Sequence, residues 1–121
     1  MTKEIQIDER LLESFHLMWD HFPECVQLAH KSFLVLAVNP AASLIGREVG
    51  MICAKHGPPE AHKGCLATSM VKKQKAMWKA APPLEEGKLG KVVFWLPIEG
   101  YPDFYLHFGV GFQKDYTLDN E

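Results

Sequence analysis

Apolar residues near the start of the chain recur at steps of three and four positions, which is the spacing of one helical face. The stripe consists of Leu11, Leu12, Phe15, Met18, Trp19 and Phe22. Asp8 and Glu9 precede it, where negative charge favours a helix start, and Pro23 ends it. The pattern predicts an amphipathic helix whose stripe packs either on its own domain or on a partner chain.

Two segments after this helix have the pattern of short strands. Residues 25–29 alternate between apolar and other positions, as a half-buried strand does. Residues 33–38 are apolar on both faces, which predicts a central or covered strand. Asn39 and Pro40 end that strand, and residues 41–45 predict a short helical turn.

The second half of the chain predicts a helix and then a hairpin. Residues 61 to about 78 have the pattern of a long helix with Cys65 and Ser69 on its inner side and Met70 and Met77 as further candidates for that side. Residues 91–98 and 103–112 flank a turn and predict two antiparallel strands. One face of the last strand collects Phe104, Leu106, Phe108, Val110 and Phe112. Strands at both ends with helices between them indicate an antiparallel α+β sheet with helices on one face.

Composition narrows the class of protein. The 121 residues suit one domain, and 47% hydrophobic with 23% charged residues is a globular composition. A net charge of −2 argues against binding to nucleic acid. Four lysines at 72, 73, 75 and 79 indicate a solvated helix face, with polyanion binding as the alternative.

The same analysis predicts no membrane attachment and a cytoplasmic protein. No apolar run approaches the roughly 20 residues that span a bilayer, and the first ten residues lack the core of a signal peptide. Three cysteines cannot all pair within the chain, which suits a reducing compartment.

Several segments in this order resemble the PAS family of sensory domains. The helix ending at a proline (FHLMWDHFPE), the strand pair CVQLAHKSFLVLAV and the segment VNPAASLIGREVG resemble a PAS opening. In that opening a strand ends in Asn, small residues follow, and Leu and Gly close the turn. The matching residues here are Asn39, Ala41, Ala42, Leu44 and Gly46. The segment 114–117 resembles the short Asp-x-Thr signature through which PAS domains lead into an output helix.

The resemblance implies a five-stranded antiparallel sheet with helices on one face and an N-terminal amphipathic helix. It places a single domain over residues 1–121, with its core at about 9–117. It also implies a small-molecule pocket, a homodimer through the N-terminal helix, and an output domain or partner protein. The chain departs from the family pattern in its proline-rich stretch after Trp78 and in ending just after the segment 114–117. An output domain would therefore lie on another chain, lie outside this sequence, or not exist.

One segment concentrates residues that can bind a metal. Cys53, His56, His62 and Cys65 form two close pairs joined by a short loop, and thiolates with imidazoles suit tetrahedral zinc or another transition metal. A subset of PAS domains has a similar Cys-containing segment, with His62 here in place of a Cys. A redox-responsive thiol pair and a purely structural role are the alternatives.

Haem is a weaker variant of this hypothesis. Its axial ligand would be His62, at the start of the predicted long helix, in keeping with the resemblance to PAS sensors that bind haem through such a His. His107 lies on the last strand and could face either the pocket or solvent.

Arrangements typical of catalysis are missing from the sequence, which has no nucleophile elbow, phosphate-binding glycine loop or His-Glu-x-x-His pair. We therefore expect a sensory domain, not an enzyme. It would bind a small molecule, metal or haem and signal through protein–protein contacts. The alternative is a ligand-free interaction or dimerisation module.

Overall fold

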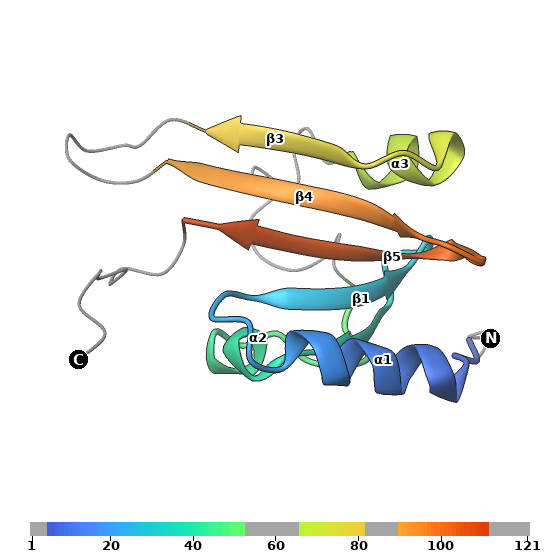
Figure 1. Ribbon diagram of the computed structural model, residues 1–121, viewed down its shortest axis with the longest axis horizontal. Coiled ribbons are helices and arrows are strands. Elements are labelled where there is room, and N and C mark those ends of the chain that lie inside the picture. Colours follow the sequence, from blue (N-terminus) through green and yellow to red (C-terminus); the bar gives the residue numbers. More distant parts are fainter. Residues whose placement is uncertain (1–4, 53–65, 82–89, 112–121) are drawn as a thin grey trace.

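The computed structural model describes residues 5–52, 66–81 and 90–111. Five strands form one antiparallel sheet in the order β2-β1-β5-β4-β3 (Figure 1). The strands are β1 (Val26–His30), β2 (Val35–Val38), β3 (Met77–Ala81), β4 (Lys91–Ile98) and β5 (Tyr101–Val110). The helices are α1 (Glu9–Trp19), α2 (Pro40–Leu44) and α3 (Ala67–Lys73). The predicted α+β class with a five-stranded antiparallel sheet is confirmed.

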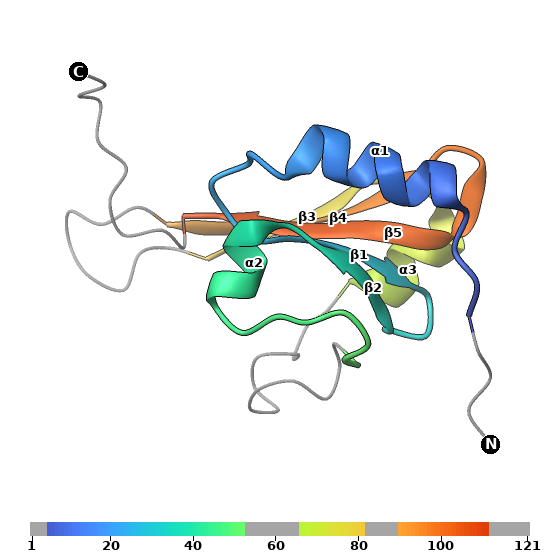
Figure 2. The same ribbon diagram turned by 90° about the horizontal axis from the view of Figure 1, so that it is seen from below.

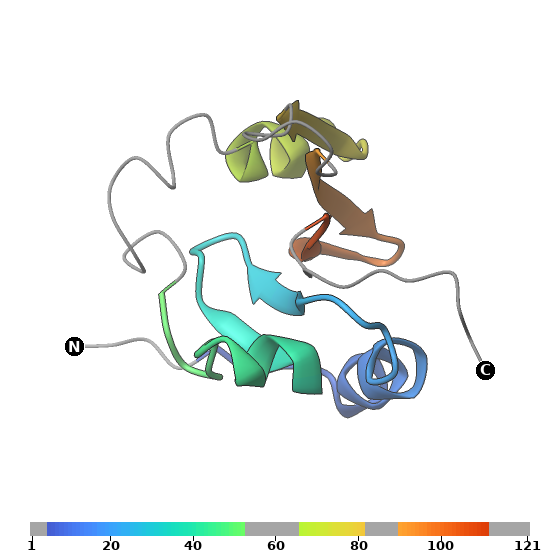
Figure 3. The same ribbon diagram turned by 90° about the vertical axis from the view of Figure 1, so that its left-hand side faces the viewer.

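The helices lie on both sides of the sheet. Helix α1 crosses one face, and α2 and α3 lie on the other (Figure 2). On the second face, α3 contacts β4 and β5, and α2 contacts β1 and β2 toward the other edge of the sheet (Figure 3). We call the face under α1 the outer face and the face under α2 and α3 the inner face.

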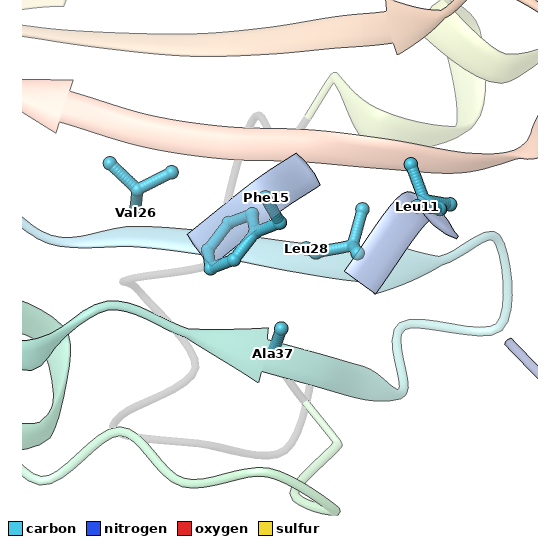
Figure 4. Close-up of a cluster of buried hydrophobic side chains, with 5 residues drawn as sticks. All are labelled: Leu11, Phe15, Val26, Leu28 and Ala37. Atoms are coloured by element: carbon cyan, nitrogen blue, oxygen red, sulfur yellow. The ribbon is translucent and has the colours of Figure 1, made fainter. Parts of the chain in front are cut away.

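The register of the strands confirms the predicted alternation in β5. Phe108 lies opposite Val26 in β1 and Phe94 in β4, and Leu106 lies opposite Leu28. Phe104, Leu106 and Phe108 all pack into the outer core, beside the buried side chains of Leu11, Phe15, Val26, Leu28 and Ala37 (Figure 4). The hairpin is therefore as predicted, although its second strand begins at Tyr101 and not at residue 103.

The apolar stripe of α1 packs on its own sheet. Leu11 is 8% exposed and Phe15 only 2%, because both point from α1 onto β1 and β2 (Figure 4). Burying a Phe side chain contributes about 2–3 kcal/mol, so this contact holds α1 to the domain. The prediction that a partner chain covers this stripe is wrong for Leu11 and Phe15. Met18, by contrast, is 66% exposed.

The predicted long helix over 61–78 is wrong after Lys73. Helix α3 ends at Lys73, its C-cap Gln74 has a left-handed φ of 51°, and the chain then enters strand β3. The Gln74 side chain donates to the carbonyls of Val71, at 2.8 Å, and Pro102, at 3.1 Å. These bonds tie the helix end to the β4–β5 hairpin. Trp78, expected near the end of a helix, therefore pairs with Phe94 in the sheet.

Within α3, Met70 is fully buried as predicted, whereas Ser69 is exposed. Residues 61–65, the first part of the predicted helix, lie outside the described residues. Among the helices in the described ranges, none is long and apolar enough to cross a membrane.

Candidate functional site

The inner face of the sheet carries a row of four side-chain positions across four strands. Gln27 in β1 lies opposite His107 in β5, His107 lies opposite Trp95 in β4, and Trp95 lies opposite Met77 in β3. Gln27 is 1% exposed and Trp95 is 5% exposed, while His107 is half-buried. The row places an amide and an imidazole side by side on a face that is otherwise largely apolar.

His107 is held in one orientation on this face. Its Nδ1 lies 3.0 Å from the carbonyl oxygen of Phe94, and its ring stacks on Trp95 with centroids 4.9 Å apart and planes 15° apart. A carbonyl only accepts, so Nδ1 carries a proton and donates in this contact, and Nε2 is the second ring nitrogen. The sequence left open whether His107 faces a pocket or solvent, and the structure places it on the inner face.

The part of the inner face next to α3 is filled by the protein's own side chains. Tyr105 is 1% exposed, and it packs with Met70, Ala67, Trp95 and Ala29 in the second core cluster. A ligand on this face would therefore lie beside this cluster and not within it.

Asn39 joins the helix before the sheet, the first strand and the helix on the inner face. Its side chain is completely buried. Its Nδ2 donates to the carbonyl oxygens of Trp19, Phe22 and Glu24 at 3.1, 3.2 and 2.9 Å. Its Oδ1 accepts from the backbone N–H groups of Val26 and Ala42, both at 3.0 Å. The second of these caps the N-terminus of α2.

A second buried polar contact connects the start of the sheet to its end. Glu24 is 3% exposed, and its carboxylate accepts from the backbone N–H of Gly111, directly after β5. Gly111 has a φ of 94°, and a Cβ on it would overlap the carbonyl oxygen of Gly90. Only glycine fits this position.

Sequence reasoning recognised Asn39 as a strand end but missed its five side-chain hydrogen bonds. It also missed Glu24 and Gly111. An acidic residue between a helix-ending proline and an apolar strand was the available signal for Glu24. Nothing in the local pattern pairs it with a residue 87 positions later.

The predicted metal ligands Cys53, His56, His62 and Cys65 lie outside the described residues. In the ranges that the structure does describe, no group of three or more His, Cys, Asp or Glu side chains could hold a metal ion.

Comparison with solved structures identifies the fold. The PAS domain of BvgS from Bordetella pertussis matches with a TM-score of 0.63 at 13% identity, covering 86% of this chain and 88% of that one. A LOV protein from Rhodobacter sphaeroides gives a TM-score of 0.61 at 16% identity, covering 90% and 70%. A sensory box histidine kinase from Vibrio cholerae gives 0.53 at 14%, covering 84% and 90%.

No family model matches the chain, and no curated protein does. The fold is therefore recognised from structure alone, since the identities are low throughout. It is the PAS fold, which the order of motifs in the sequence predicts.

Proposed function

We propose that this chain is a non-catalytic sensory module that binds a small molecule at the inner face of its sheet and signals through protein contacts. The observation that carries the proposal is the Asn39 network. One buried side chain holds the end of α1, the start of β1 and the start of α2 together. A ligand that displaces α2 changes the geometry around Asn39, and thereby the contacts that position α1.

Glu24 connects the hydrogen bonds of Asn39 to the end of β5. Its backbone carbonyl accepts from Asn39, and its carboxylate accepts from Gly111. The junction between α1 and β1 is therefore connected both to the inner-face helix and to the exit of β5. In a PAS-type module these are the places from which an output domain or partner protein would receive the signal. A cytoplasmic setting is part of this proposal.

The inner face supports a ligand that combines an apolar body with hydrogen-bonding groups. The amide of Gln27 and the imidazole of His107 are the polar groups in the same row as the ring of Trp95. Small-molecule sites typically combine an apolar lining with a few fixed polar groups.

We further propose a homodimer through α1, formed by the part of the helix that its own sheet leaves uncovered. Leu17 is 84% exposed and Met18 is 66% exposed. The double variant Leu17→Glu/Met18→Glu should keep the fold and sediment as a monomer. The matched control Leu44→Glu/Ile45→Glu changes two exposed apolar residues at the end of α2, on the other side of the sheet, and should behave as wild type. A wild-type chain that is monomeric at high concentration would rule out this dimer.

The sensory proposal is tested by native mass spectrometry with elemental analysis on protein purified without added metal or cofactor. A bound organic mass supports a small-molecule sensor, and a stoichiometric transition metal supports a site at Cys53, His56, His62 and Cys65. Haem would be recognised by its mass and iron content. A bare chain that also binds nothing in a metabolite screen favours the ligand-free interaction module. The dense packing of Met70, Trp95 and Tyr105 is the observation that favours this second function.

A further inference from the structure

The two edges of the sheet differ in how they are covered. Beyond β2, residues 50–52 continue the hydrogen bonding: the N–H of Val35 donates to Met51 at 2.9 Å, and the N–H of Gly50 donates to Val35 at 2.8 Å. Leu34 and Ile52 also form a bridge. At the other edge, the sheet ends at β3, and no described strand pairs with its outer side (Figure 1). An edge strand presents backbone donors and acceptors that can pair with an added chain.

The side chains of β3 leave this edge accessible. Trp78, Lys79 and Ala80 are all exposed, and Trp78 has 63% of its surface in solvent. Trp78 lies opposite Phe94, which places it at the border of the outer apolar face. Every second side chain of a strand added beside β3 would lie on the outer face and pack against one side of Trp78. The intervening side chains would lie on the inner face, next to Lys79.

Positive charge gathers at the start of the same edge. Lys72 and Lys73 end α3, and Lys75 lies just before β3; all three are exposed. Within the described part of the chain, no ion pair involves any of these three. The sequence has no Asp or Glu from residue 61 to 84, although the whole chain carries a net charge of −2. The local field therefore favours an acidic partner.

We propose that the open edge of β3 binds an extended, acidic segment of a partner protein by strand addition. The segment has acidic residues at the end that lies beside Lys72, Lys73 and Lys75. Along β3 it alternates apolar residues, which pack against Trp78, with acidic residues, which face Lys79. Main-chain hydrogen bonds supply affinity, and the alternation and charge supply selectivity. The proposal depends neither on a bound small molecule nor on the dimer through α1.

The test uses a synthetic peptide of about ten residues, the length that an edge strand with flanking contacts requires. The peptide begins with an acidic run and continues with Glu alternating with Val. Amide hydrogen exchange of the full chain should show added protection confined to β3 when the peptide is present. A matched peptide with N-methyl groups on alternate backbone nitrogens keeps the charge and side chains but cannot pair, so it should neither bind nor protect β3.

Charge variants complete the test. Lys72→Gln/Lys73→Gln/Lys75→Gln should weaken peptide binding about tenfold at low salt, since exposed charge pairs contribute little individually. Lys72→Arg/Lys73→Arg/Lys75→Arg should bind as wild type. If the N-methylated peptide binds as well as the parent, or heparin competes without protecting β3, the lysines form a polyanion site and strand addition is refuted. Absence of binding at millimolar peptide also overturns the proposal.

Discussion

The Asn39→Ala variant removes the side chain that connects three parts of the protein. The change deletes five hydrogen-bond contacts at once, three of which share the two hydrogens of Nδ2. It leaves the N–H groups of Val26 and Ala42 without their side-chain acceptor. Because Asn39 is completely buried, water does not reach its present position to replace these bonds.

The expected loss in the free energy of unfolding follows from the backbone groups that lose a hydrogen-bond partner. Loss of an N-cap costs about 0.5–2 kcal/mol, and a buried N–H without an acceptor costs about 1–3 kcal/mol. The three carbonyls lose a donor as well, so we expect the free energy of unfolding to fall by about 3–5 kcal/mol. This is a large part of the roughly 5–15 kcal/mol that stabilises a typical domain.

Urea unfolding measures this loss directly. With a denaturant slope of about 1–3 kcal/mol/M, the midpoint should fall by about 1–5 M. Asn39→Ser keeps an oxygen that can cap α2 but does not reach the three carbonyls. Its free energy of unfolding should therefore lie between those of the wild type and Asn39→Ala. Ser43→Ala, on the exposed side of α2, should change stability by less than about 0.5 kcal/mol. If Asn39→Ala costs less than about 1 kcal/mol, the network does not hold the junction and cannot transmit a displacement of α2.

Three further outcomes are expected. Gly111→Ala should lower the thermal unfolding temperature much more than Gly100→Ala. Both glycines have a positive φ, but only Gly111 lies against a neighbouring carbonyl. Equal losses of stability would contradict this close contact. The Tyr101 hydroxyl donates to Asp8 at 2.8 Å and holds the pKa of that carboxyl below 3.8. The hydrogen bond to ionised Asp8 therefore stabilises the fold fully above the unfolded-state pKa of Asp8. This stabilisation is lost as the pH falls through the lower folded-state pKa of Asp8. Tyr101→Phe should remove this part of the acid dependence, and an unchanged acid titration would show that the contact does not form. Cys65→Ser should lower both metal content and stability if the Cys/His segment binds a metal, and protein purified without any metal would exclude that site.

Local sequence pattern determined those features that depend on neighbouring residues. Alternation placed Phe104, Leu106 and Phe108 on one side of β5, since successive side chains of a strand point to opposite faces. Asp8 and Pro23 bracket the observed helix α1, whose N-cap is Asp8. The order of these elements predicted an antiparallel α+β sheet, and the resemblance of the segments around Asn39 to the PAS family predicted the PAS fold.

Only the tertiary structure decided the features that depend on long-range contacts. Trp78 continues a helical pattern, yet pairing with β4 places it in a strand, because sheet formation overrides a weak local preference. The stripe of α1 suited either a partner or its own domain, and packing on β1 and β2 selected the second. Glu24 and Gly111 meet only because β5 lies beside β1, and no local period encodes such a pairing.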